Sequence, residues 1–318
     1  MPISDRTIFI SGGAGFIGTQ LAMRLIDKNR IVIYDNLHRD ALRYSAIYKH
    51  QNLKLIEGDV LDQDNLKKAI AGSDYIIHLA AVAGVDTVRE MPIETLKINF
   101  IGTLNLLEAV REATTPKRIL NFSSSEVFGP HVYLAEEHSE VVLGAVAESR
   151  WTYAVSKLAA EHLAYNYYKI HNLPTVTVRP FNVYGPFQVG IGAIHEFIKK
   201  AIKDETIEIH GDGTQIRAWC YIDDMIEGIL LCLENEEAIG HVFNIGNPQT
   251  AITVLNLAKM IINLTVSKSE IIYTWQDYTD VELRIPSIEK AKKILGFNPR
   301  YDLESGLRLT IDWYRRNG

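Results

Sequence analysis

The sequence predicts an α/β protein with a doubly wound parallel sheet and a smaller C-terminal lobe. Through the first half, short runs rich in β-branched residues alternate with amphipathic stretches of helical length, the order typical of parallel strands covered by helices on both faces. After about residue 180 this rhythm becomes irregular, with glycine and proline in residues 183–192 and a turn at 210–215. We therefore expect one domain over residues 1–180 and a second lobe over 181–318, with some strands of the second lobe returning to the first domain.

Continuous apolar runs, rather than alternating ones, predict the strands, because parallel strands are buried on both faces. The runs span residues 7–11, 30–35, 53–57, 74–80, 118–123 and 175–181. Apolar residues at helical spacing predict the helices. In the first half these include 92–113 and 151–170, and the second half has a helix from 223, a strand at 241–246 and helices near 253–264, 287–295 and 303–316.

Composition excludes several classes of function. With 33 basic and 39 acidic residues the net charge is -6, which gives no electrostatic footprint for nucleic acid or an anionic membrane. Cys220 and Cys232 lie in apolar stretches without CxxC spacing, so we expect buried free thiols in a reducing compartment. The absence of a basic leader and of a long apolar run predicts a cytoplasmic protein without a membrane span. The ten histidines form no HExxH motif, so no metal site is expected.

A glycine motif follows the first predicted strand. Gly12, Gly15 and Gly18 lie at three-residue spacing between that strand and a helix, an arrangement that allows a tight turn and seats a pyrophosphate at the helix N-terminus. The second strand ends in Asp35, whose carboxylate can accept hydrogen bonds from both ribose hydroxyls and would repel a 2'-phosphate. The sequence therefore predicts an NAD site.

A phenol and an ammonium share one face of the predicted helix at 151–170. Tyr153 and Lys157 are four residues apart, about one helical turn. A phenol with a pKa near ~10 is a poor base at neutral pH, and a nearby ammonium is expected to favour its phenolate form. The predicted cofactor-binding residues are Gly12, Gly15, Phe16, Ile17, Gly18, Asp35, Asn36, Asp59, Val60, Leu79, Ala80, Ala81, Asn99, Tyr153 and Lys157.

Taken together, the motifs resemble extended short-chain dehydrogenase/reductases that modify nucleotide sugars, and the likeness spans essentially the whole chain. It is carried by the glycine motif with Asp35 and by HLAA, the serine cluster SSSEVFG, YAVSK and RPFNVYGP. The resemblance implies that Tyr153 and Lys157 are catalytic, that Ser124 orients the sugar's 4-hydroxyl, and that NAD oxidises the sugar at C4. It further implies a homodimer formed through the helices at 92–113 and 151–170.

The same resemblance implies two contacts with the sugar diphosphate. Asn182 is expected near it, and Arg217 on its phosphates. Arg217 also makes physical sense because a net-acidic protein that binds a diphosphate needs a planar cation close by. A salt bridge from Arg217 to Asp212 or Asp223 is the alternative.

Three reactions can follow oxidation at C4. In the dehydratase branch an aspartate precedes the glutamate, and Ser125 occupies that position; a serine hydroxyl is a very weak acid for expelling water. A C4 epimerase needs no further carboxylate, which would leave Glu126 without a task. In decarboxylation the C4 ketone accepts electrons from a carboxylate attached at C5.

The stretches SRWTYAVSK, FNIGNP and DVELRIPSIEKAKKILGFNP, together with the serine cluster, resemble UDP-glucuronate decarboxylases. The resemblance implies that Arg284 is functional and that Glu126 and Arg284 handle the carboxyl-bearing end. The alternatives are a backbone-bonded Glu126, and an Arg284 that contacts phosphate or pairs with Asp280 or Glu282. Thr87 stands where decarboxylases usually carry a tyrosine, which leaves C4 epimerisation open.

We therefore expect an NAD-dependent enzyme that decarboxylates UDP-glucuronate. C4 epimerisation of a nucleotide sugar or nucleotide uronic acid is the alternative, followed by 4,6-dehydration and by an NAD-sensing protein without activity. The expected partners are a UDP-linked sugar and a second copy of the chain. The predicted catalytic residues are Tyr153, Lys157, Ser124, Glu126, Arg284 and Ser125, and the substrate-binding residues are Asn182, Arg217 and Arg284.

Overall fold

The computed structural model describes residues 2–190, 192–275 and 280–317. Its centre is a seven-stranded sheet in which every neighbouring pair is parallel. In spatial order the strands are β12 (Val242–Ile245), β7 (Thr175–Pro180), β5 (Arg118–Phe122), β4 (Tyr75–His78), β1 (Thr7–Ser11), β2 (Arg30–Asp35) and β3 (Leu53–Glu57). The strand order reverses between β1 and β4, and ligands of doubly wound sheets bind at the carboxyl ends of such strands. The predicted fold class is confirmed.

Alternate residues of β1 show how the two faces of the sheet are buried. Ile8 and Ile10 belong to one apolar cluster, which also contains side chains of α1 and α8. Phe9 belongs to a second cluster, formed with side chains of α2 and α5. Because successive side chains of a strand point to opposite faces, helices cover the sheet on both sides.

Eleven α-helices are present in the described parts of the chain. They are α1 (Phe16–Leu25), α2 (Gln63–Ile70), α3 (Val85–Glu90), α4 (Pro92–Leu96), α5 (Gly102–Ala113), α6 (Thr152–His171), α7 (Ala193–Ile202), α8 (Ile222–Glu234), α9 (Val254–Thr265), α10 (Glu289–Leu295) and α11 (Leu303–Asn317). The helix predicted at 92–113 is α4 and α5 joined by a π-helical turn, η2 (Lys97–Ile101). No helix in the described parts of the chain is long and apolar enough to span a membrane.

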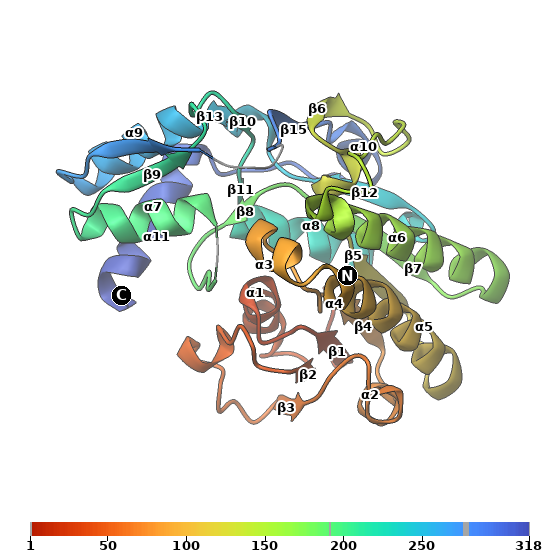
Figure 1. The fold of residues 1–318 in the computed structure, drawn as a ribbon. Helices are drawn as coiled ribbons and strands as arrows, with labels where there is room; N and C mark the ends of the chain where they lie inside the picture. The colour runs from red at the N-terminus through yellow and green to blue at the C-terminus, as the bar shows by residue number, and fades with distance from the viewer. Residues whose placement is uncertain (1, 191, 276–279, 318) are drawn as a thin grey trace.

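The second lobe is built from short strands. They are β6 (His131–Ala135), β8 (Val183–Tyr184), β9 (Ile207–His210), β10 (Ile216–Arg217), β11 (Cys220–Tyr221), β13 (Ile252–Thr253), β14 (Ile271–Thr274) and β15 (Leu283–Pro286). Four of them form the sheet β13-β10-β15-β6, and the others pair as β11-β8 and β14-β9. In Figure 1 the four-stranded sheet lies at the opposite end of the molecule from β2, β3 and α2.

The two halves of the chain exchange strands. β12, from the second half, completes the large sheet beside β7, while β6, from the first half, pairs with β15 in the lobe. β6 was not anticipated; its apolar run VYLA is short, and only Val132 of the strand is buried. The exchange brings the segment after β5 close to β15, and so joins residues far apart in sequence at one site. The division at residue 180 stays a prediction.

Candidate active site

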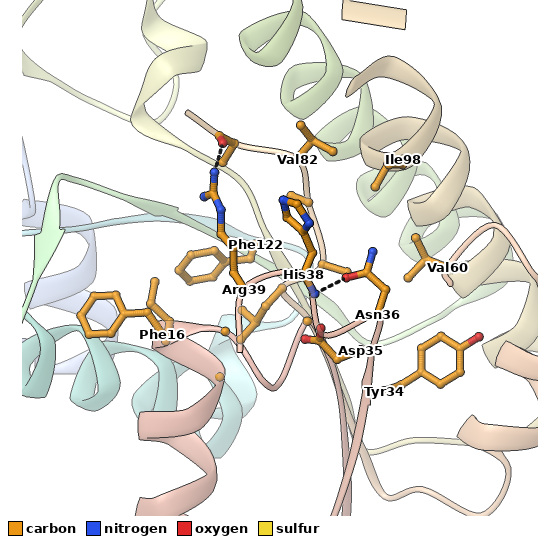
Figure 2. A pocket seen from close by; sticks show the side chains of 18 of the residues that line it. Phe16, Tyr34, Asp35, Asn36, His38, Arg39, Val60, Val82, Ile98 and Phe122 are labelled. Carbon is orange, nitrogen blue, oxygen red and sulfur yellow. Dashed lines mark hydrogen bonds between the residues drawn. The ribbon is translucent and has the colours of Figure 1, made fainter. Parts of the chain in front are cut away.

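A cavity of about 520 Å³ opens where β1 and β4 end (Figure 2). All but three of the predicted cofactor residues line it: Gly12, Gly15, Phe16, Ile17, Gly18, Asp35, Asn36, Asp59, Val60, Leu79, Ala80 and Ala81. Further lining residues that the sequence did not indicate include Tyr34, His38, Arg39, Gly58, Val82, Ala83, Met91, Ile98, Phe122, Gln188 and Val189.

The glycine loop leaves room for an anion beside α1. Gly12 has a φ of 70°, and a Cβ there would lie 2.5 Å from the backbone nitrogen of Ala80, so a larger residue cannot occupy this position without moving β4. Helix α1 begins at Phe16, with Gly15 as a cap that offers no side chain and no acidic residue in its first turn. The first amides of α1 are therefore available to a pyrophosphate. These residues fit an NAD molecule.

Asp35 supports the glycine loop and faces the cavity. Its carboxylate accepts hydrogen bonds from the amides of Ala14 at 3.0 Å and Leu37 at 2.8 Å. Burial raises the pKa of Asp35, and these two amides oppose that rise. Each carboxylate oxygen keeps lone pairs for a ribose hydroxyl.

Replacing Asp35 with asparagine tests this assignment. The change keeps an acceptor for one of the two loop amides and removes the charge that would bind the ribose and repel a 2'-phosphate. We expect NAD binding to weaken by about 1.5–3 kcal/mol, the range for hydrogen bonds to charged groups, and the preference for NAD over NADP to shrink. Calorimetric titration with both dinucleotides measures each effect. Unchanged affinities for both would contradict the assignment, and the same substitution at the exposed Asp64 is the control.

Arg39 and Thr87 both line the cavity. Arg39 donates a hydrogen bond to the Ala83 carbonyl at 2.9 Å, as the dashed line in Figure 2 shows. Thr87, on α3, lines the cavity; a threonine here is smaller than the tyrosine that decarboxylases usually carry.

Asn99 does not line the cavity, in contrast to its predicted role. Its amide is used by the protein: it accepts a hydrogen bond from the Val82 amide at 2.8 Å and donates to the Val82 carbonyl at 3.1 Å. It also donates to the Ser156 hydroxyl at 3.0 Å. Asn99 therefore holds the segment after β4 against α6 and supports the cavity wall from behind.

Tyr153 and Lys157 lie in the first turns of α6, next to the end of β5. The Lys157 ammonium donates a hydrogen bond to the Phe122 carbonyl at 2.7 Å and lies 6.0 Å from the centre of the Tyr153 ring. A hydrogen bond with Ser124 favours the phenolate of Tyr153. Ser124 also accepts a hydrogen bond from the Glu126 amide at 3.1 Å and so caps the short turn η3 (Ser125–Phe128).

The pKa of Tyr153 differs from expectation. Removal from water raises it to about 12, and the hydrogen bond with Ser124 and the nearby Arg284 and Arg39 oppose that rise without overcoming it. The Lys157 ammonium, which donates to the Phe122 carbonyl, is not among the groups that lower this pKa. In this structure Tyr153 therefore keeps its proton at neutral pH.

A buried group of charges lies beside Tyr153. Glu126 forms an ion pair with Arg284, and its second oxygen is 3.6 Å from an Nη atom of Arg150. Asp280 lies 3.6 Å from Arg150 and 3.2 Å from Arg217. Burial alone would raise the pKa of Glu126, but Arg284, Arg150 and Arg217 outweigh it and hold that pKa below its ordinary value. With three guanidiniums and two carboxylates, this arginine cluster has one net positive charge.

Strand pairing brings these charges together. Arg217 on β10 and Arg284 on β15 are directly opposite each other in a parallel pair, so like charges meet unless carboxylates separate them. Arg217 pairs with Asp280 instead of Asp212 or Asp223, and Arg284 pairs with Glu126 instead of Asp280 or Glu282. The phosphate contact of Arg284 stays a prediction. Sequence reasoning missed Arg150, although its position three residues before Tyr153, beside a tryptophan, was a possible signal.

The remaining predicted residues lie around this cluster. Asn182 donates a hydrogen bond to the carbonyl of Ala218, which follows Arg217, at 2.8 Å. Ser125 is buried at the start of η3.

Cys220 and Cys232 are buried and free, as expected.

A dinucleotide cavity at the switch point of the sheet, with a phenol and an ammonium on the adjoining helix, defines an NAD-dependent enzyme of the extended short-chain dehydrogenase/reductase type. More particularly, the chain belongs to the NAD-dependent epimerase/dehydratase family, whose model matches residues 8–246. The predicted enzyme class and the NAD cofactor are confirmed.

Named relatives modify nucleotide sugars. The chain is 32% identical to a UDP-N-acetyl-alpha-D-glucosaminuronate decarboxylase of Bacillus cytotoxicus, over 96% of this chain and 97% of the relative. It is 33% identical to UDP-glucuronic acid decarboxylase 1 of Danio rerio, over 98% of this chain and 73% of that one. The structure of UDP-glucuronic acid 4-epimerase from Bacillus cereus, with UDP-glucuronic acid and NAD, is similar with a TM-score of 0.89 and 29% identity, covering 98% of this chain and all of that one.

Proposed function

We propose that this protein oxidises a UDP-linked uronic acid at C4 and then decarboxylates it, with UDP-glucuronate as the substrate. The observation that carries the proposal is the arginine cluster of Arg150, Arg217 and Arg284 beside Tyr153. Its net positive charge suits a substrate that carries both a diphosphate and a carboxylate. The relatives named as decarboxylases of UDP-linked uronic acids support the same reading.

The residues divide the work by position. In its phenolate form, Tyr153 takes the proton of the 4-hydroxyl, and Ser124 orients that hydroxyl through its contact with the phenol. NAD held by the glycine loop and Asp35 would accept the hydride from C4. Because burial raises the pKa of the phenol, its phenolate is a strong base for this proton, and the phenol is a weak acid when the proton is returned to the ketone.

Carbon dioxide is lost after the oxidation. The bond between C5 and the carboxyl carbon breaks, its electron pair moves towards the C4 ketone, and C5 then takes up a proton. Arg284 is neutralised by Glu126, whereas the Nε and Nη1 atoms of buried Arg150 have no hydrogen-bond partner among the described residues. We therefore assign Arg150 to the carboxylate end, Arg217 with Asn182 to the diphosphate, and Glu126 with Arg284 to the proton at C5.

C4 epimerisation is the second candidate, and Thr87 favours it. A small residue in the cavity wall leaves more room for a ketosugar to turn over than a tyrosine would. The similarity to a UDP-glucuronic acid 4-epimerase points the same way. Both candidates share the oxidation by Tyr153 and differ only in the fate of the carboxylate.

We infer a homodimer from the exposed apolar side chains on α4, η2 and α6. These are Ile93, Leu96, Ile101, Val155 and Tyr165, each more than two-fifths exposed. Burial of such a face between two copies would remove apolar surface from water. Sedimentation at micromolar concentration would show a dimer, and a monomer would contradict this inference.

The proposed reaction is tested by supplying UDP-glucuronate and analysing the product by mass spectrometry. Decarboxylation predicts a product lighter by one carbon dioxide. Epimerisation predicts an unchanged mass with a new configuration at C4, visible by NMR. UDP-glucose, which lacks the carboxylate, is the matched control and must give no carbon dioxide.

A further inference from the structure

The last residue of β5 and the two residues that follow it are held along one face of α6. The Phe122 carbonyl accepts a hydrogen bond from Lys157. Ser123 donates its hydroxyl proton to Glu161, with 2.5 Å between the oxygens, and Ser124 hydrogen-bonds Tyr153. Since the helical partners are four residues apart, they occupy successive turns of one helix face. The segment that carries Ser124 is thus fixed at three adjacent points.

Glu161 is itself held by a buried partner from the sheet. Arg179 on β7 donates to both oxygens of Glu161, from Nε at 2.8 Å and from Nη2 at 2.7 Å. Both side chains are 6% exposed. Arg179 also donates to the Glu137 carbonyl at 3.2 Å and stacks on the Phe128 ring, with its guanidinium carbon 4.7 Å from the ring centre. It therefore contacts the end of η3 as well as α6.

A buried ion pair contributes little net stability, because desolvation offsets much of the attraction. Its presence here therefore points to a role other than stability. The neighbouring residues suggest that role. Glu161 lies one helical turn from Lys157, and Ser123 joins its carboxylate to the residue next to Ser124. A pair placed here controls both the position of the serine segment and the charge beside the phenol.

Lys157 is surrounded by few other charges. Removal from water lowers the pKa of Lys157 to about 8, and the Glu161 carboxylate opposes that fall. On β4, His78 is neutral near pH 7, since burial and then the Lys157 charge lower its pKa to about 3. Around the ion pair of Glu161 and Arg179, the other charged groups are Glu137 and, next to it, Lys290.

We propose that Glu161 and Arg179 are positioning residues for the oxidation at C4: Glu161 holds Ser123 in place and keeps the Lys157 ammonium charged, and Arg179 fixes Glu161. This inference rests on the proposed function, because it assigns the pair to the reaction of Tyr153. It gives the pair two separable effects, one through the hydrogen bond to Ser123 and one through charge.

Four variants separate these effects. Glu161→Gln keeps an acceptor for Ser123 and removes the charge. Ser123→Ala removes the hydrogen bond and keeps the charge. Glu161→Asp keeps the charge on a shorter side chain. The double variant Glu161→Gln/Arg179→Met removes both buried charges, so it can fold where the single neutral variant leaves Arg179 unpaired.

The measurement is the first-turnover reduction of NAD by UDP-glucuronate, followed by absorbance as a function of pH. In Glu161→Gln and in the double variant, we expect the alkaline limb to move to lower pH by about one unit, because a carboxylate near an ammonium raises its pKa. Ser123→Ala should lower the rate about tenfold or more at every pH, the effect of one hydrogen bond to a charged group, without moving the limb. Glu161→Asp, which keeps the charge, should leave the alkaline limb at its wild-type position.

Glu108→Gln is the control, since this carboxylate bonds Tyr167 on the same helix but does not contact Lys157. An alkaline limb that stays in place in the folded double variant overturns the inference, even if the rate falls. If the wild-type protein reduces no NAD with any UDP-linked sugar, the proposed function fails, and this inference with it. Reduction by the wild type together with an unmoved limb overturns the inference alone.

Discussion

Replacing Tyr153 with phenylalanine is expected to slow NAD reduction by UDP-glucuronate about 10²–10⁴-fold, the usual contribution of a positioned acid or base. The phenol is the only group in the proposed reaction that takes the proton of the 4-hydroxyl. Phenylalanine fills the same space, so folding and NAD binding should be kept. Stopped-flow absorbance of the reduced nicotinamide measures the rate, and calorimetry measures NAD affinity.

The same helix supplies a matched control for this variant. Tyr165 is 46% exposed on α6, and replacing it with phenylalanine should leave the rate unchanged. A Tyr153→Phe protein that reduces NAD at the wild-type rate would remove the phenol from the reaction. A loss of NAD affinity comparable to the loss of rate would instead make Tyr153 a binding residue.

Replacing Glu126 with glutamine is expected to lower the free energy of unfolding by about 3 kcal/mol, the lower end of the range for breaking a buried ion pair. Arg284 is 2% exposed, and without Glu126 the three guanidiniums of the arginine cluster would face Asp280 alone. Urea unfolding measures the change. Carbon dioxide release from UDP-glucuronate should also fall in this variant, while the first reduction of NAD continues.

The ion pair of Glu126 and Arg284 predicts that substitutions of the two residues have non-additive effects on the free energy of unfolding. Glu126→Gln combined with Arg284→Gln should cost less than the sum of the single changes, because each single change leaves a buried charge behind. Glu282→Gln is the control, since its side chain is 72% exposed and lies 3.6 Å from His131 at the surface. Equal stability of Glu126→Gln and the wild type would show that the cluster is not held by this pair.

Local patterns predict the nucleotide end of the molecule well, because each feature depends on residues close in sequence. The glycine loop, α1 and Asp35 follow from one strand, one turn and one helix, and the φ of Gly12 is of the kind that favours glycine. The helix face that carries Tyr153 and Lys157 follows from helical spacing alone. These residues lie where the motifs place them, although their roles stay predictions.

The sugar end depends on contacts that sequence patterns do not contain. Arg150 contacts Glu126 and Asp280, which lie far apart in the sequence. These contacts exist only because β6 leaves the first half to pair with β15. Arg179 was also missed, because its contact with Glu161 joins a strand to a helix and the spacing within either element does not show it. The pKa of Tyr153 was misjudged because spacing shows that Lys157 is near, but not that burial of the phenol raises its pKa.

The most direct test of the account follows the carboxyl carbon itself. UDP-glucuronate labelled with ¹³C in its carboxyl group is incubated with the NAD-loaded protein, and the gas and the product are analysed separately. Decarboxylation after oxidation at C4 predicts labelled carbon dioxide in the gas from the wild type, none from Tyr153→Phe, and an unlabelled sugar product. Label that stays in a product sugar of altered C4 configuration would contradict decarboxylation and select the epimerase.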